Sequence, residues 1–124
     1  MTIIEAITKL DELKFNTYSQ TDKIEWLSRL DSAVKLQIID THEGGEDVHF
    51  NGYTVDTPHD TVLLVPSPYD EVYLRWMEAQ IDYYNGEYGK YNNSIIMYNT
   101  AFDAYARYYK LHHMPLRRGS RFIF

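Results

Sequence analysis

Apolar residues recur at the three- and four-residue spacing of a helix along most of the chain, and this pattern constrains the fold more than any other feature. The clearest stretch covers about residues 21–41. Its apolar face is wide enough to pack against two neighbouring elements. The face consists of Ile24, Trp26, Leu27, Leu30, Ala33, Val34, Ile38 and Ile39. The same spacing predicts a shorter first helix that ends near Leu13.

Side chains that cap helices predict where these two helices begin. Thr2 and Glu5 have the spacing of a capping box, in which each side chain accepts a hydrogen bond from the backbone N–H of the other residue. Ser19 is a suitable cap for the second helix, and Thr21 is equally suitable.

A further helical pattern follows Ser67-Pro68, where Ser is a preferred cap and Pro suits the first helical position. The apolar phase continues without a shift as far as Tyr109, although Asn85-Gly86 interrupts it with residues typical of a turn. One long kinked helix or two helices joined by a turn would explain this pattern. A helix of about 40 residues is far above the usual length, so we expect two helices. Pro115 ends the last one by Met114.

The segment between the second and third helices has a different character. Asn51-Gly52 is flanked by strand-forming residues and predicts a β-hairpin, with Phe50 and Tyr53 beside the turn. The apolar run over 61–65 indicates either a further strand or a buried extended connector. We therefore expect one mainly α domain over residues 1–124. It would be a bundle of about four helices, with a hairpin or loop insertion over 43–66 and an extended C-terminal tail over 115–124.

Tyrosine is unusually abundant in the composition. Aromatic residues make up 15% of the 124 residues, and 12 of them are tyrosines. Because a tyrosine has a large apolar ring with a polar tip, it suits interfaces between proteins. The chain has no cysteine, which excludes disulfides, a thiol nucleophile and Cys-ligated metals.

The charge is distributed unevenly. The formal net charge is −6, yet the last ten residues hold three arginines and no acid. An acidic body argues against general binding to nucleic acid, and it allows the basic tail of one copy to seek the acidic surface of another. The apolar end of the tail is costly to leave in water, so we expect it to dock on the same chain or on a neighbour. The candidate interface residues are Phe50, Tyr53, Arg117, Arg118, Arg121, Phe122, Ile123 and Phe124.

No constellation typical of an enzyme is found in the sequence. There is no nucleophile elbow, phosphate-binding glycine loop or dinucleotide fingerprint. The pairs Asp40/His42 and His59/Asp60 lack the further ligands that a metal site needs, and the adjacent His112 and His113 point to different sides of a helix. We expect no catalytic residue, no metal and no cofactor. No apolar stretch is long enough to span a bilayer, and no signal peptide is visible at the N-terminus.

Several dispersed motifs resemble those of head–tail connector proteins of tailed bacteriophages, as found in prophages of Gram-positive bacteria. Those in the N-terminal half are Asn16-Thr17-Tyr18, Lys23-Ile24, Trp26-Leu27, Leu30-Asp31 and Ile39-Asp40-Thr41-His42. Those that follow are Leu63-Leu64-Val65-Pro66, Pro68-Tyr69-Asp70, Asp82-Tyr83-Tyr84-Asn85-Gly86-Glu87, Tyr91-Asn92-Asn93 and His113-Met114-Pro115-Leu116. The resemblance covers most of the chain except about residues 43–60.

This resemblance implies a structural virion protein of the neck, made in the cytoplasm of the bacterial host. It would dock as a ring under the portal protein, usually with twelve-fold symmetry, and extend the DNA channel toward the tail. Its partners would be other copies of itself, the portal and the next neck or tail-completion protein, with DNA only passing through and no membrane. The alternatives are another neck or tail-completion protein, a small interaction module of the host, or an enzyme or ligand-binding protein with a deep polar pocket.

Overall fold

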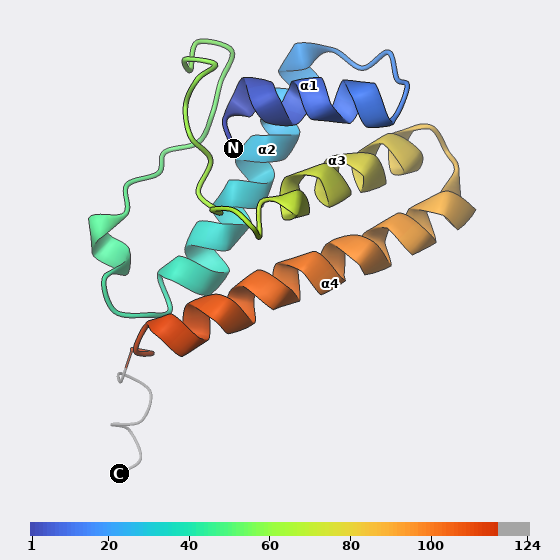
Figure 1. Ribbon diagram of the computed structural model, residues 1–124. Helices are drawn as coiled ribbons and strands as arrows, with labels where there is room; N and C mark the ends of the chain where they lie inside the picture. The colour runs from blue at the N-terminus through green and yellow to red at the C-terminus, as the bar shows by residue number, and fades with distance from the viewer. Residues whose placement is uncertain (117–124) are drawn as a thin grey trace.

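The computed structural model describes residues 1–116 and is built from four α-helices packed together (Figure 1). The helices are α1 (Ile3–Leu13), α2 (Gln20–Val34), α3 (Glu71–Tyr84) and α4 (Tyr88–His112). Two short helical segments follow α2, the π-helix η1 (Lys35–Ile39) and the 3-10 helix η2 (Gly45–Asp47). The expectation of a mainly α fold with four helices is confirmed. None of these helices is both long enough and apolar enough to cross a membrane.

The predicted caps of the first two helices are present. Thr2 and Glu5 form the complete capping box, in which the Glu5 carboxylate accepts from Thr2 N at 2.8 Å and Thr2 Oγ1 accepts from Glu5 N at 3.2 Å. Ser19 caps α2, because its hydroxyl oxygen accepts from Asp22 N at 3.1 Å. These local contacts satisfy backbone donors that a helix start leaves unpaired.

The start of α3 differs from the prediction. Ser67 does not cap the helix, because residues 67–70 form a turn and the helix begins at Glu71 after Asp70. Tyr69 N donates to Pro66 O at 2.9 Å within this turn. The ring of Tyr69 packs on α4, with its centroid 4.8 Å from that of Tyr108, so tertiary contacts favour the turn over a longer helix.

The break between the last two helices lies where the sequence predicts it. Asn85-Gly86 forms the turn, with Gly86 at a φ of 77° that L-residues rarely adopt. Glu87 N donates to Asp82 O at 2.9 Å and closes the turn. Consequently α3 and α4 run antiparallel and side by side (Figure 1).

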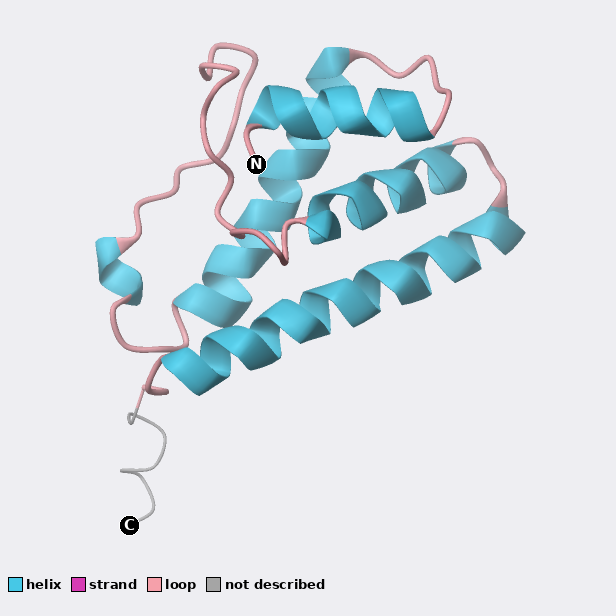
Figure 2. Cartoon of the chain, in the orientation of Figure 1, coloured by secondary structure: helices cyan, strands magenta, loops and turns pink. Residues whose placement is uncertain are grey.

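The prediction of a β-hairpin at Asn51-Gly52 is wrong, since residues 1–116 contain no β-strand (Figure 2). The favoured hairpin turn needs a positive φ at both central residues, and here only Gly52 has one, at 89°. The segment binds to helix α2 instead, where Ser28 Oγ accepts a hydrogen bond from Tyr53 N at 3.0 Å. The 43–66 segment is therefore a loop that is held by the bundle. Its last part is the extended connector, in which Leu63 N donates to Met1 O at 2.9 Å.

A buried carboxylate joins this loop to two helices. Asp31 of α2 is 0% exposed and accepts hydrogen bonds from the hydroxyl of Tyr53 at 2.5 Å, the hydroxyl of Tyr73 at 2.6 Å and the backbone N of Leu64 at 3.1 Å. Tyr73 in turn accepts from Val65 N at 2.6 Å. The surrounding core is apolar and is formed mainly by α1, α2 and α3.

Candidate interaction surface

Six aromatic residues gather at the end of the bundle where the α1–α2 loop meets the α3–α4 turn. Tyr83 lies 5.3–6.0 Å, between ring centroids, from three other tyrosines of this group, and Tyr84 stacks on Trp26 at 6.0 Å with the planes 7° apart. We call this group the aromatic cluster; it consists of Tyr18, Trp26, Tyr83, Tyr84, Tyr88 and Tyr91.

The outer part of the aromatic cluster faces solvent. Tyr83 is 47% exposed, Tyr84 51% and Tyr88 61%. Phe15 of the α1–α2 loop is 89% exposed. Exposed aromatic rings in this number cost free energy in water, and aromatic residues are enriched at protein interfaces.

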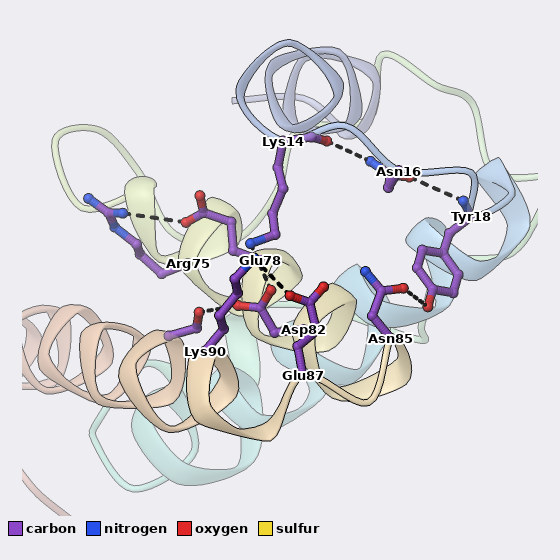
Figure 3. Close-up of polar contacts among 10 residues, drawn as sticks. Lys14, Asn16, Tyr18, Arg75, Glu78, Asp82, Asn85, Glu87 and Lys90 are labelled. Carbon is purple, nitrogen blue, oxygen red and sulfur yellow. Dashed lines mark hydrogen bonds and ion pairs between the residues drawn. The ribbon is translucent and has the colours of Figure 1, made fainter.

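A polar network holds the α1–α2 loop against the α3–α4 turn (Figure 3). The Tyr18 hydroxyl donates to Asn85 Oδ1 at 2.6 Å, and Asn16 Oδ1 accepts from Tyr18 N at 3.2 Å. Asn16 also donates through Nδ2 to Lys14 O at 2.9 Å. The network holds the two segments that carry the aromatic rings in place.

A buried ion pair fixes α1 to α3 beneath this network. Asp82 is 1% exposed, and its Oδ1 lies 2.7 Å from Nζ of Lys14, which Figure 3 shows reaching from the end of α1. Ser94 of α4 donates to Asp82 Oδ2 at 2.5 Å. No hydrogen-bond donor within residues 1–116 compensates Oδ1 apart from the Lys14 ammonium. This arrangement ties three helices together at the end that bears the aromatic cluster.

A small pocket opens in the same surface. It has a volume of about 230 Å³ and is lined by Tyr18, Asp22, Glu25, Trp26 and Tyr84. Its lining thus combines three aromatic residues with two acidic ones. We call this hollow the acidic-aromatic pocket.

The outer face of α4 continues the exposed surface without charge. Between residues 92 and 100 the helix carries no ionisable acid or base other than Tyr98. Ile96 is 61% exposed and Met97 48%. In a chain with a net charge of −6, a charge-free helix face is typical of the centre of a protein interface.

The interface residues predicted in the loop lie elsewhere. Tyr53 is 9% exposed, and its hydroxyl is bound to Asp31, so in the single chain its side chain stabilises the fold. Phe50 is partly buried and packs on Tyr53 with ring centroids 5.0 Å apart. A role for these two residues in an interface stays a prediction. The tail residues Arg117, Arg118, Arg121, Phe122, Ile123 and Phe124 lie outside the described residues.

The carboxylate of Asp31 is bonded within the core. Burial raises the pKa of Asp31, and its three donors oppose that rise. Burial and the neighbouring Asp31 raise the pKa of the Tyr53 and Tyr73 hydroxyls, which therefore stay protonated and donate. Asp31 is 0% exposed, and both of its carboxylate oxygens accept hydrogen bonds. Within residues 1–116, no three His, Asp or Glu side chains converge as metal ligands.

Sequence reasoning did not find the aromatic cluster, although it noted the tyrosine excess. The signal that could have found it is the grouping of Tyr83, Tyr84 and Tyr88 on both sides of the predicted break, together with the aromatic linker over 15–18. What the sequence could not indicate is that these two segments meet.

No protein-family model matches the chain, and comparisons with curated proteins and with solved structures find no match either.

Proposed function

We propose that this protein is a structural virion protein, the head–tail connector of a tailed bacteriophage or prophage. In this role it docks as a ring under the portal, with twelve-fold symmetry, and extends the DNA channel toward the tail. It acts by binding other proteins in the virion neck. It is synthesised in the cytoplasm of the bacterial host. The sequence motifs that resemble connectors supply the specific identity in this proposal.

The observation that supports an assembly role best is the aromatic cluster with its exposed rim. Tyr83, Tyr84 and Tyr88 present large rings to solvent on a base that the Tyr18–Asn85 hydrogen bond and the Lys14–Asp82 ion pair hold in place. Binding such a surface requires little ordering of side chains, because the rings are already positioned. The charge-free face of α4 next to it adds area that a partner can cover.

The charge of the chain is compatible with a channel protein. Its net charge of −6 disfavours adhesion to DNA phosphates, so DNA passing through a ring of such subunits would not be retained. The tail over 115–124 is the segment that we propose to reach a neighbouring subunit, the portal or the next neck protein.

A second candidate is another neck or tail-completion protein, or a small host interaction module. The acidic-aromatic pocket is the observation that favours this alternative, because a basic segment of a protein other than the portal would also fit it. The neighbouring genes separate the two candidates, because a connector gene is expected just after the portal and capsid genes.

The test is light scattering of the purified chain alone and after mixing with the portal protein from the same genome. We expect oligomers that form with rising concentration or only when the portal is added. A strict monomer with its portal present would overturn the proposal.

A further inference from the structure

The acidic-aromatic pocket has the chemistry of a site for a single cationic side chain. Tyr18, Trp26 and Tyr84 pack against one another, with ring centroids 5.4, 6.0 and 6.4 Å apart. Trp26 is 3% exposed and supports the other two rings, and Tyr84, at 51%, is the ring most open to a ligand. A cation gains free energy when it lies within about 6 Å of the centroid of such a ring. Asp22 and Glu25 also line the pocket and give it negative charge.

Neither carboxylate is committed to a strong partner. Within residues 1–116, no lysine or arginine lies within ion-pair distance of Asp22. Glu25 pairs with Arg29 at 2.5 Å, but both side chains are more than half exposed. Exposed pairs of this kind contribute little, so an incoming cation can replace Arg29.

The size of the pocket selects among cations. Its volume of about 230 Å³ is below the roughly 300–1,000 Å³ of pockets that hold small-molecule ligands, and it suits one side chain. Between the two basic side chains, arginine fits better than lysine. Its planar guanidinium stacks on aromatic faces and binds carboxylates through two parallel hydrogen bonds.

The chain itself contains arginines that suit this pocket, and they lie outside the described residues. The segment 117–124 contains Arg117, Arg118 and Arg121 and no acid, so it complements the pocket in charge. It follows Leu116, whose backbone N donates to Thr41 O at 3.1 Å just beyond η1. The pocket lies at the other end of α2, where Asp22 and Glu25 occupy the first turns.

The distance between these two ends favours a neighbouring copy over the same chain. From Asp22 to the end of η1 at Ile39 the helical path is about 26 Å long. Two residues beyond Leu116 span at most about 7 Å, and the five residues to Arg121 at most about 18 Å. The arginines at 117 and 118 therefore stop short of the pocket of their own chain, and Arg121 approaches it only at full extension.

We infer that the acidic-aromatic pocket binds an arginine side chain from the 117–121 segment of a neighbouring copy of this chain. The pocket lies at the start of α2, and the described chain ends at Leu116 beside Thr41, beyond the other end of α2, so the contact would run head to tail. Contacts of that type close into rings when the rotation between subunits permits. The inference rests on the proposed function for its ring, and it supplies the contact between adjacent subunits.

A peptide titration tests the pocket without requiring a ring. The probe is a synthetic peptide of residues 115–124, and the receiver is the full chain with Arg117, Arg118 and Arg121 replaced by glutamine. Calorimetry should detect binding of this peptide. A matched peptide with the three arginines replaced by glutamine, which retains Phe122 to Phe124, should bind at least tenfold more weakly. Equal affinity of the two peptides would overturn the inference.

Variants of the receiver locate the binding site. Adding Asp22→Asn with Glu25→Gln, or Tyr84→Ala, should weaken binding at least tenfold, while Tyr84→Phe should retain it. Glu46→Gln with Asp47→Asn removes the same charge from η2, far from the pocket, and should leave affinity unchanged (Figure 1). Circular dichroism checks that each receiver is folded. Undiminished binding to the Asp22/Glu25 variant would place the arginine elsewhere and refute the site.

The unmodified chain distinguishes a neighbour from the same chain as the source. If tails exchange between copies, light scattering should show association that the triple arginine-to-glutamine substitution abolishes. A chain that stays monomeric at every concentration and still excludes the peptide would hold its own tail, which contradicts the inference. Peptide binding without any ring on the portal would leave the pocket standing and remove the connector proposal. A portal ring without peptide binding would support the connector proposal and refute the binding of arginine in the pocket.

Discussion

The hydroxyl of Tyr18 donates a hydrogen bond of 2.6 Å to the side chain of Asn85, which lies 67 residues further along the chain. This bond joins the α1–α2 loop to the α3–α4 turn. It holds one wall of the acidic-aromatic pocket in place, because Tyr18 packs edge to face on Trp26.

Removing this bond should loosen both connections. Tyr18→Phe retains the ring and loses the hydroxyl, so the free energy of unfolding should fall by no more than about 1 kcal/mol, the usual value of one partly exposed hydrogen bond. Hydrogen exchange should accelerate at residues 14–19 and 85–87 and stay unchanged in the middle of α2. Unchanged exchange in the two connections would show that the bond does not order them.

The buried Asp31 cluster should be a main source of stability. Tyr73→Phe removes a donor to a buried carboxylate and the acceptor of Val65 N, so unfolding in urea should require about 2 kcal/mol less. Tyr108→Phe is the control, because Tyr108 is only partly buried and contacts His112 through its backbone O and not through its hydroxyl, so it should change stability by less than about 0.5 kcal/mol. Equal losses in the two variants would contradict a special role for Asp31.

The ion pair between Lys14 and Asp82 should show strong coupling. Lys14→Met leaves a buried carboxylate without its cation and should cost about 2–3 kcal/mol, less than the roughly 3–5 kcal/mol of a fully buried pair because Lys14 is 28% exposed. Combining it with Asp82→Asn should recover much of that loss. A double-mutant cycle with urea unfolding measures the coupling, and strictly additive effects would argue against the pair.

Alkaline pH should destabilise the packing of α4. Burial raises the pKa of Tyr98 and of Tyr105 to about 12 in the folded chain, above the ordinary value of 10. The stabilisation from these protonated phenols is complete below pH 10 and is lost as the pH rises toward 12, because the unfolded chain loses its protons first. Urea unfolding across this range should show the decline, and Tyr105→Phe should make it shallower. A parallel decline in the variant would exclude Tyr105 as a cause.

Much of the fold could be predicted because its signals are local. The capping box at Thr2 and Glu5, the Ser19 cap and the turn at Asn85-Gly86 each depend on residues within one helical turn. Predictions failed where distant residues decide the backbone. The hairpin at Asn51-Gly52 is replaced by a loop because Ser28 and Asp31 of α2 bind Tyr53.

The sequence could predict that the chain has an interaction surface, but not which residues form it. Tyrosine abundance indicated an interface, but the aromatic cluster combines residues 18, 26 and 83–91, which only the packing of α2 and α3 brings together. Likewise the acidic-aromatic pocket depends on the stacking of Tyr84 on Trp26. These residues are 58 positions apart, and nothing in the sequence indicates that they are in contact.

The exposed rings of Phe15, in the α1–α2 loop, and Tyr88, in the aromatic cluster, should be needed for assembly and dispensable for folding. Phe15→Ser with Tyr88→Ser removes two rings that are 89% and 61% exposed, so stability should change by less than about 1 kcal/mol. Val55→Ser with Val62→Ser is the matched control, since these side chains are 55% and 67% exposed on the other loop. Urea unfolding verifies that both variants are folded.

The most direct measurement is electron microscopy of the portal protein mixed with the full chain, with the Phe15/Tyr88 variant and with the Val55/Val62 control. We expect an added ring of density under the portal for the full chain and for the control, and the loss of this ring in the Phe15/Tyr88 variant. A bare portal with the unmodified chain would contradict the connector proposal, and an intact ring with the Phe15/Tyr88 variant would contradict a role for these two exposed rings in assembly.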